Sequence, residues 1–253
     1  MKSLAVTIIT FNEEKNIERC LKSVQKIADE IVVVDSFSQD DTASICKRYN
    51  VKFVQRSFTG YSDQKNFAAN QADAEYILSL DADEALSDEL LDSINKEKEK
   101  GFIADAYIMN RCTSFCGHWI KHGSWYPDKK LRLYNKNKGR WGALSIHEKI
   151  DMDTDNVQTL KGDILHYSYY SLSEVIIQNN KFTTIQSEAM FKAGKKASWF
   201  KIVINPLVAF INGYIFKLGF LDGIDGFFIA SSVAYQTMVK YAKLKKLYQN
   251  KFE

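Results

Sequence analysis

Two aspartates stand two residues apart at the end of an apolar run in the stretch LSLDADE, residues 78–84. Asp81 and Asp83 offer hard carboxylate oxygens, which suit Mg²⁺ or Mn²⁺, and Glu84 adds a third acid. Such cations usually complete their coordination with phosphate groups of a substrate. An isolated D-x-D pair is also common in solvated surface turns, so its meaning depends on the element that carries it.

Several familiar ligand motifs are absent from the sequence. No G-x-G-x-x-G follows the first apolar run and no G-x-x-x-x-G-K-[ST] occurs, which disfavours dinucleotide oxidoreductases and P-loop kinases. A calcium loop of the EF-hand type is excluded because Leu86 stands where that loop requires glycine.

Further polar residues stand where other apolar runs end. Thr10 and Glu13 follow the first run, and Asp35 ends the second run in VVVDS. A carboxylate in the position of Asp35 can accept hydrogen bonds from a nucleobase or a ribose. The alternative is that Asp35 only opens a turn, although Asp40 or Asp41 is better placed to cap the next helix.

The elements that must position these residues are short apolar runs at 4–10, 30–36, 51–55 and 75–83, separated by segments of helical composition. Continuous apolar strands that alternate with helices predict a parallel sheet covered on both faces, which is an α/β fold. Ligands of such sheets bind beyond the carboxyl ends of the strands. We therefore expect four strand ends to meet at one crevice. Residues 101–168, with β-like pieces and many aromatic residues, predict an extension of the sheet.

A long helix is predicted after residue 170. SLSE at 171–174 is a capping box, in which Ser171 and Glu174 satisfy each other's backbone N–H groups. An apolar stripe follows at helical spacing: Leu172, Val175, Ile176, Phe182 and Ile185.

Residues 199–220 form an apolar segment almost long enough to cross a bilayer. Because Lys201 and Lys217 would be costly in hydrocarbon, we expect a helix, broken near Pro206, that lies in the membrane interface. A core or oligomer-forming helix and a true membrane span stay open as alternatives. The lysine-rich tail KYAKLKKLYQNK fits an anionic leaflet or a solvated last helix.

The chain has 253 residues, a formal net charge of +3 and four cysteines without a framework spacing. This length suits one large domain or one domain with an appendage. A net charge this small does not indicate nucleic-acid binding, which usually requires a concentrated basic face. The cysteines and the lack of a leader with a cleavage site predict a reducing, cytoplasmic compartment.

Four motifs in the first half of the chain resemble, in order and spacing, the inverting nucleotide-sugar glycosyltransferases of family two, which have the GT-A fold. They are TIITFNEEKNIERCLKSV, IVVVDSFSQDDT, GYSDQKNFAAN and LSLDADE. Later stretches are similar to the branch that includes bacterial lipopolysaccharide core glucosyltransferases: GHWIKHGSWYPDKKLRLYNK, SIHEKI, LHYSYYSLSE and LGFLDGIDGF. The resemblance implies a nucleotide-sugar-binding half (1–100), an acceptor-binding half of the same GT-A domain (101–170) and a helical, membrane-associating region (171–253).

The resemblance also implies roles in donor binding. Thr10 and Glu13 would line the nucleotide pocket, and Asp35 would hold the uracil or its ribose. Lys65 and Asn66 would lie near the diphosphate.

The same resemblance makes Asp81 and Asp83 metal-site residues. They would hold Mn²⁺ or Mg²⁺, which neutralises a diphosphate leaving group, and Asp81 would also contribute to donor binding. His147 or His166 could supply a third ligand, and His147 is the one we assign. A lone histidine is, however, more often structural.

Inversion by direct displacement requires a base that deprotonates the acceptor hydroxyl. Many family members carry a Glu-Asp pair for this purpose, and the second half of this chain has none. Glu148 is the first candidate and Asp128 the second, because both lie in the acceptor half beside aromatic residues that could stack on a sugar. A structural ion pair is the alternative for Glu148.

Cys112, Cys116, His118 and His122 place four potential zinc ligands within eleven residues. The spacing lacks the long intervening segment of typical zinc sites, which favours a chance cluster. Aromatic residues of the same stretch predict a platform for the acceptor sugar, with burial in a core as the alternative: Trp119, Trp125 and Tyr126.

We therefore expect metal-dependent transfer of a hexose, glucose by the resemblance, from a UDP-sugar to a lipid-linked or lipopolysaccharide core glycan at the cytoplasmic face of the inner membrane. A nucleotidyltransferase that makes sugar nucleotides is disfavoured because TFNEEKN lacks a glycine-rich loop with arginine. A non-catalytic scaffold is disfavoured because Asp35, Asp81 and Asp83 occur together. The oligomeric state, including a homo-oligomer, stays open.

Overall fold

Two compact units make up the protein, of which the computed structural model describes residues 2–142 and 148–249. The sheet unit comprises Met1–Arg111 and Asp128–Tyr167, and the helical unit comprises Cys112–Pro127 and Ser168–Glu253. The segment 112–127, which the sequence-based division assigns to the acceptor half of the first domain, thus belongs to the helical unit.

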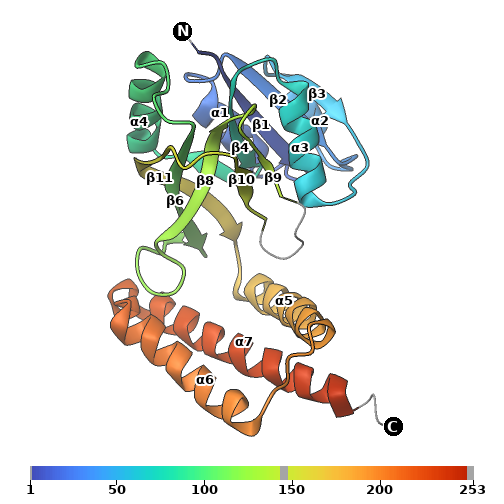
Figure 1. The fold of residues 1–253 in the computed structure, drawn as a ribbon, viewed down its shortest axis with the longest axis vertical. Helices are drawn as coiled ribbons and strands as arrows, with labels where there is room; N and C mark the ends of the chain where they lie inside the picture. The colour runs from blue at the N-terminus through green and yellow to red at the C-terminus, as the bar shows by residue number, and fades with distance from the viewer. Residues whose placement is uncertain (1, 143–147, 250–253) are drawn as a thin grey trace. The chain divides into compact units, whose positions relative to one another are not determined.

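Four parallel strands form one half of the sheet (Figure 1). They are β1 (Leu4–Thr10), β2 (Glu30–Asp35), β3 (Lys52–Gln55) and β4 (Tyr76–Asp81), in the order β3-β2-β1-β4. Each strand lies within one of the apolar runs, and β1 is buried along its whole length. The predicted α/β sheet is therefore confirmed.

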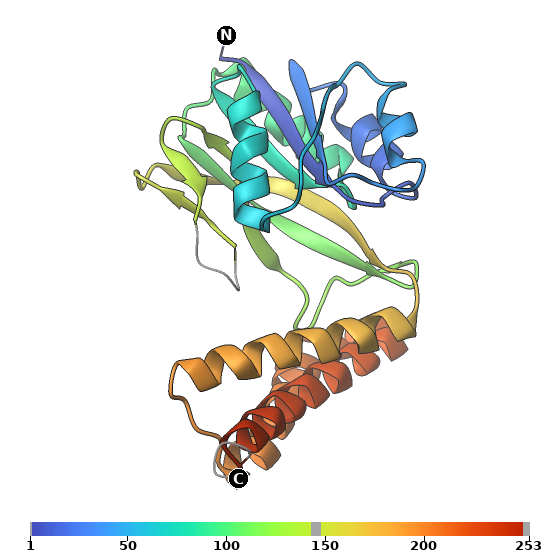
Figure 2. The ribbon, with the colours of Figure 1, turned by 90° about the vertical axis from the view of Figure 1, so that its right-hand side faces the viewer.

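Helices cover both faces of this half of the sheet. They are α1 (Ile17–Val24), α2 (Thr42–Cys46), α3 (Tyr61–Gln71) and α4 (Asp88–Glu99). One apolar core packs Leu21 of α1 and Leu90 of α4 against the sheet, and a second core contains Ala68 and Ala69 of α3. Figures 1 and 2 show α3 and α4 on opposite sides of the strands.

The other half of the sheet is antiparallel. β8 (Asp128–Asn135) pairs with β4, followed by β6 (Ala106–Phe115), β11 (Val157–Tyr169) and β5 (Glu84–Leu86). β7 (His118–Trp119) pairs with β6, whereas β9 (Gly139–Trp141) and β10 (Ile150–Met152) form a separate two-stranded ribbon. The predicted extension of the sheet is confirmed.

Three helices dominate the helical unit: α5 (Leu172–Lys192), α6 (Trp199–Ile211) and α7 (Gly223–Gln249). Packing of α7 against both other helices forms the unit. Ser171 Oγ accepts a hydrogen bond from Glu174 N (3.3 Å), and the Glu174 carboxylate accepts one from Ser171 N. The predicted capping box is thus confirmed.

The predicted helix break near Pro206 is wrong. α6 continues through Pro206, and the chain turns instead at a π-helical segment (Asn212–Phe216) and a 3-10 segment (Gly219–Asp222). Proline lacks the backbone N–H that would bond to the carbonyl four residues earlier in the helix. No residue of α6 is buried, so that unpaired carbonyl can face water. At this turn the backbones of Gly219 and Gly226 approach closely. A Cβ on Gly226 would collide with the carbonyl of Gly219, so only glycine permits the contact.

Most of the apolar stripe predicted for α5 is exposed within the helical unit. Val175 is buried, whereas Ile176 is 57% exposed and Phe182 is 43% exposed. The buried face of α5 also carries small polar residues, such as Asn179, which donates to Ser232 Oγ of α7 (2.6 Å). The packing of α5 on α7 thus combines apolar contacts with polar ones.

The segment Trp199–Phe216 is long and apolar enough to cross a bilayer by length and composition, with a mean hydropathy of 1.4. Only 6% of that segment is buried. The helical unit by itself therefore does not bury it.

Candidate active site

Three polar residues stand at the carboxyl ends of neighbouring parallel strands. Thr10 of β1 is paired in register with Asp35 of β2, and Ile9 is paired with Asp81 of β4. β3 ends at Gln55, beside Asp35. The strand ends therefore converge as the sequence predicts, at the edge where open α/β sheets bind ligands.

Asp35 is fully buried and is held by three donors. Its carboxylate accepts hydrogen bonds from Ser38 N (3.0 Å), Ser38 Oγ (2.5 Å) and Gln55 Nε2 (2.9 Å). The Thr10 hydroxyl beside it is buried and has no hydrogen-bond partner among the described residues. Because buried polar groups are normally paired, this hydroxyl is an exception among the described residues.

Glu13 lies in the loop after β1, which is bonded to the loop after β2. Its N–H donates to Thr42 Oγ1 (2.8 Å), and its carboxylate accepts from Asn16 Nδ2 (2.8 Å). Burial raises the pKa of Glu13, the hydrogen bond from Asn16 lowers it, and the charge of Asp83 raises it again. The negative field that Glu13 experiences would be relieved by a bound cation.

Asp81 lies between two positively charged side chains. Lys65 Nζ is 3.0 Å from one carboxylate oxygen, and Arg132 Nη2 is 3.1 Å from the other. Burial raises the pKa of Asp81, but the charges of Lys65 and Arg132 outweigh burial and hold the pKa well below its usual range. A metal ion on Asp81 would therefore compete with both side chains.

Glu84, the third acid of LSLDADE, is structural. It is fully buried, accepts a hydrogen bond from Asp81 N (3.0 Å) and pairs with Arg132 (3.1 Å). The buried guanidinium of Arg132 thus pairs with the carboxylates of Asp81 and Glu84. These ion pairs hold the turn between β4 and β5 in place.

Asp83 faces a histidine from the antiparallel half of the sheet. Asp83 Oδ2 lies 3.1 Å from His166 Nε2, and the Asp83 carbonyl accepts a hydrogen bond from Tyr167 N (2.8 Å). The register of β11 against β5 places His166 opposite Glu84. A carboxylate oxygen and an imidazole nitrogen at this separation form a donor pair that suits Mn²⁺.

The described residues offer few ligands for a metal ion. Within residues 2–142 and 148–249, no group of three or more His, Cys, Asp or Glu side chains is arranged to hold a metal ion. His147, the third ligand that we predict, lies outside the described residues. Asp83 and His166 would offer a cation only two protein donors and would leave most of its coordination sphere for a ligand and water, as is usual for ions bound with phosphates.

Glu148 reaches the ion-pair network from the segment before β10. Its Oε2 lies 3.2 Å from Lys65 Nζ, so Lys65 bridges Glu148 and Asp81. The Lys65 ammonium also lies 4.4 Å from the centre of the Trp141 ring. The ion-pair alternative for Glu148 is thus present, while its side chain stays 25% exposed and accessible to an acceptor.

Asp128 is more heavily paired than Glu148. Arg111 Nη2 lies 2.8 Å from one carboxylate oxygen, and Lys130 Nζ lies 3.0 Å from the other. Both oxygens of the Asp128 carboxylate are therefore already engaged by cationic side chains.

The side chain of Asn66 holds the backbone of Trp141 in place. Its Nδ2 donates to the carbonyl of Trp141 (2.8 Å), and its Oδ1 accepts from the N–H of Trp141 (2.9 Å). Both amide atoms are engaged, so Asn66 holds β9 such that the Trp141 ring covers Lys65.

The four potential zinc ligands of 112–122 do not gather in the structure. His118 Nδ1 pairs with Asp225 (2.7 Å) and His122 Nδ1 with Asp222 (2.9 Å), while Cys112 is buried. Within the helical unit, the two histidines thus connect this stretch to the end of the 3-10 segment and to the first turn of α7.

Of the aromatic residues of the same stretch, Trp125 takes part in packing. The Trp125 ring stacks on Tyr169 with ring centres 5.2 Å apart and lies edge-on to Phe115. Trp125 therefore contributes to the small apolar core of the helical unit.

Sequence reasoning missed the contributions of Arg132 and Trp141 to the site, and it counted Glu84 among the acids of a cation site, whereas Glu84 is buried and paired with Arg132. Arg132 lies in LRLYNK, a stretch that carried the family resemblance, but its neighbours Leu131 and Leu133 give no local signal of its ion pairs. Trp141 gave no signal, because its role depends on the pairing with Asn66 across 75 residues.

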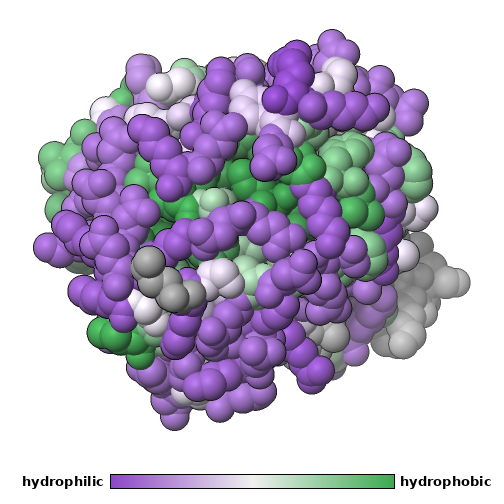
Figure 3. Space-filling model, turned by 90° about the horizontal axis from the view of Figure 1, so that it is seen from above, coloured by the Kyte–Doolittle hydropathy of each residue, from purple (hydrophilic) through white to green (hydrophobic). Residues whose placement is uncertain are grey.

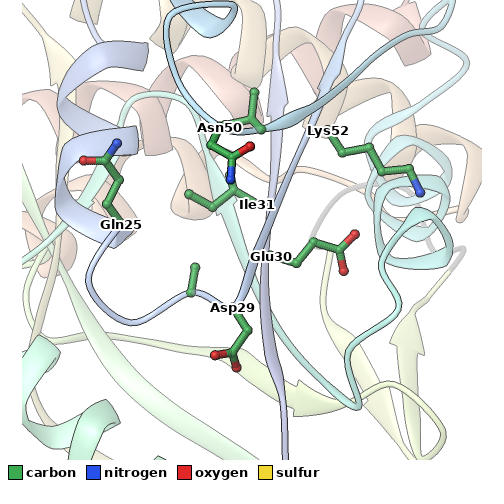
Figure 4. Close-up of a pocket in the computed structure, with 8 residues that line it drawn as sticks. Gln25, Asp29, Glu30, Ile31, Asn50 and Lys52 are labelled. Carbon is green, nitrogen blue, oxygen red and sulfur yellow. The ribbon is translucent and has the colours of Figure 1, made fainter.

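At the opposite end of the strands from the candidate site, a pocket of about 430 Å³ lies by the amino ends of β2 and β3 (Figure 4). Asp29 and Glu30 line it, but they are engaged locally: Asp29 accepts from Leu4 N (2.8 Å) and Glu30 from Asp73 N (2.8 Å). Figure 3 shows a mostly hydrophilic face with a central apolar strip. This pocket lies at the other end of the strands from Thr10, and we assign it no role.

Comparison with known proteins places this geometry in a family. The family model for Glycosyl transferase family 2 matches residues 5–152. An uncharacterized glycosyltransferase of Rickettsia typhi is 31% identical over 98% of this chain and 88% of that protein. The lipopolysaccharide core biosynthesis glycosyltransferase LpsC of Rhizobium meliloti is 27% identical over 95% of this chain and 91% of that protein.

Solved structures share the fold at low sequence identity. The mannosyltransferase PcManGT of Pyrobaculum calidifontis superposes with a TM-score of 0.56 at 14% identity, over 96% of this chain and 87% of that chain. Glucosyl-3-phosphoglycerate synthase of Mycobacterium tuberculosis gives a TM-score of 0.51 at 14% identity, over 78% of this chain and 82% of that chain. The mixed sheet is therefore the predicted GT-A fold, and the chain belongs to glycosyltransferase family 2.

Proposed function

We propose that this chain is an inverting, metal-dependent hexosyltransferase that moves a sugar, glucose in our assignment, from a UDP-sugar to a lipopolysaccharide core or lipid-linked glycan. The observation that carries the proposal is the convergence of Thr10, Asp35, Asp81 and the Asp83–His166 pair at one edge of the sheet of a family 2 chain. LpsC, similar over nearly the whole chain, supports the acceptor class.

The donor nucleoside would bind at Thr10, Glu13 and Asp35. The unpaired Thr10 hydroxyl supplies one hydrogen-bonding group, and Asp35 fixes the loop that would cover the base or ribose. The PcManGT structure contains GDP-Man and Mn²⁺, and a structure of the mycobacterial synthase contains UDP and Mn²⁺, which supports a nucleotide donor with a divalent cation.

Asp83 and His166 would hold the cation, with His147 as a third candidate. When bound, the metal supplies Lewis-acid stabilisation of the diphosphate leaving group. Lys65, which bridges Asp81 and Glu148, adds a fixed positive charge to the same site. Arg132 keeps Asp81 ionised and oriented.

Glu148 would act as the base toward the acceptor hydroxyl. It is the less heavily paired of the two candidates, since Asp128 carries Arg111 and Lys130 on its two oxygens. In this role the Glu148 carboxylate accepts the proton as the acceptor oxygen attacks the sugar.

The helical unit would attach the enzyme to the cytoplasmic face of the inner membrane, where a lipid-linked acceptor is found. Exposed apolar side chains of α6 and the lysines of α7 support this assignment.

A donor screen tests the function. Nucleotide sugars with UDP, GDP and dTDP would be compared for thermal stabilisation with and without Mn²⁺, because a ligand that binds the native state raises the melting temperature. Transfer to delipidated lipopolysaccharide core would then be followed by NMR, which reports the anomeric configuration. A donor-independent melting temperature, or retention of configuration, would overturn the proposal.

A further inference from the structure

A cavity of about 560 Å³ opens between α5, α6 and α7, within the usual size range of ligand pockets. Half of its lining residues are apolar, and they come from α6 and α7: Ile202, Met238, Val239, Ala242 and Leu247. Lys243 and Lys246 line the same cavity. It therefore joins an apolar wall to two ammonium groups.

The Lys243 ammonium is held by neutral oxygens. It donates to Asn180 Oδ1 (2.8 Å), Thr183 Oγ1 (3.0 Å) and Thr184 Oγ1 (2.7 Å), so its direction is fixed while its charge is not cancelled by these partners. Lys246 is exposed at the rim.

Positive charge dominates this end of the helical unit. After Asp225, α7 carries four lysines and no acid: Lys240, Lys243, Lys245 and Lys246. Glu188 of α5 is the acid among the residues that line the cavity. The excess favours a ligand with a negative charge, because each lysine near an anionic lipid surface contributes attraction.

The cavity adjoins an apolar surface with the composition of a membrane interface. Trp199 and Phe200, at the start of α6, are 70% and 68% exposed, and Lys245 Nζ lies 4.9 Å from the centre of the Trp199 ring. Tryptophan and lysine at the end of an apolar segment are typical of residues that lie at lipid headgroups. Ile202, one turn along the same helix, lines the cavity.

We infer that this cavity binds one anionic phospholipid, with an acyl chain against the apolar wall and the phosphate group near Lys243 and Lys246. The inference rests on the proposed attachment of the helical unit to a membrane and adds a defined lipid site to it. A second copy of the chain is a poorer occupant, because two surfaces rich in lysine repel each other.

Monomeric short-chain lipids test the site without a bilayer. The full chain would be titrated by calorimetry with dihexanoylphosphatidylglycerol below its critical micelle concentration, and with the neutral dihexanoylphosphatidylcholine. We expect saturable binding of one phosphatidylglycerol and at least tenfold weaker binding of phosphatidylcholine, roughly the effect of two lysines.

Two matched pairs of variants locate the site. Ala242→Trp, which fills the cavity, should abolish binding, whereas Tyr235→Trp on the exposed side of α7 should not. Lys246→Gln should weaken binding about fivefold, whereas Lys240→Gln, with the same change of charge outside the cavity, should leave it unchanged.

Several results would overturn the inference. They are unchanged binding in Ala242→Trp, equal binding of the two lipids, or equal effects of Lys246→Gln and Lys240→Gln. Sedimentation that shows wild type as a dimer and Ala242→Trp as a monomer would assign the cavity to a second copy. If Ala242→Trp does not fold, the lysine pair decides alone. If the enzyme transfers sugar from the donor but does not bind phosphatidylglycerol, only this inference is overturned. If it binds phosphatidylglycerol but does not transfer sugar, only the proposed function is overturned.

Discussion

The three acids at the carboxyl end of β4 differ in their partners. Asp81 and Glu84 are neutralised by Lys65 and Arg132, whereas Asp83 faces His166. A divalent cation on Asp81 would lie close to two positive charges that are already in contact with its carboxylate, and repulsion at such short range is costly. The arrangement therefore favours Asp83 over Asp81 as the metal ligand.

Asp83→Ala should lower turnover by about 10² or more at saturating Mn²⁺, because Lewis-acid stabilisation of the leaving group contributes several kcal/mol. His166→Ala should lower Mn²⁺ affinity in the same direction. Mn²⁺ binding would be measured by electron paramagnetic resonance, and folding by thermal melting. Asp81→Asn is the comparison: we expect it to keep Mn²⁺ affinity and to lose donor affinity. Loss of Mn²⁺ in Asp81→Asn alone would reverse the assignment.

Glu148→Gln should lower turnover by about 10² to 10⁴, the usual contribution of a general base, with donor and metal affinity retained. The amide keeps the size of the side chain but cannot accept the proton. Asp128→Asn is the control and should cost less, because Asp128 is already paired with Arg111 and Lys130.

If Asp128→Asn gives the large loss and Glu148→Gln the small one, the base lies before β8. The melting temperature of Glu148→Gln must be measured first, because the variant weakens the ion pair with Lys65 and a loss of folding would imitate a loss of catalysis.

The sequence was sufficient to predict which polar residues stand at the ends of the parallel strands. Thr10, Asp35 and Asp81 follow unbroken apolar runs, and parallel strands bring their ends to one edge without further information. Arg132 and His166 belong to β8 and β11, whose place depends on antiparallel pairing between distant segments. No local pattern encodes that register, so their partners could not be predicted.

At the scale of elements, capping and glycine contacts set the bounds of the C-terminal helices. The capping box at the start of α5 was readable because its two residues lie three apart. The turn after α6 was not readable, since it depends on the contact between Gly219 and Gly226 and not on Pro206. Long-range backbone contacts of this kind leave no periodic signal.

Ser171→Ala should lower the free energy of unfolding of the helical unit by about 1 kcal/mol, the usual value of an N-cap side chain. The variant removes the acceptor for Glu174 N. Ser173→Ala, in the first turn and exposed, is the matched control and should change stability little. Urea unfolding followed by circular dichroism measures both, and equal stability of the two variants would contradict a role for the capping box.

At the scale of the whole molecule, the reactivity of the cysteines measures the opening of each unit separately. Cys20 and Cys46 are buried in the sheet unit, Cys112 is buried at the start of the helical unit and Cys116 is exposed. Burial, together with the charge of Asp35, raises the pKa of Cys46 to about 12. In the native protein at pH 8, a thiol reagent should therefore modify Cys116 first, and the other three only through opening of their unit.

Donor binding should then protect the two units unequally. A ligand at about a hundredfold excess over its Kd stabilises the state that binds it by about 2.7 kcal/mol, so a UDP-sugar with Mn²⁺ should slow modification of Cys46 by about 100-fold. Because the helical unit has its own core around Phe115, Val175 and Ile229, Cys112 should keep its rate. Mass spectrometry of timed reactions gives both rates. Equal protection of Cys46 and Cys112 would mean that the units unfold together, so that a donor bound at the sheet edge also stabilises the helices that we assign to the membrane.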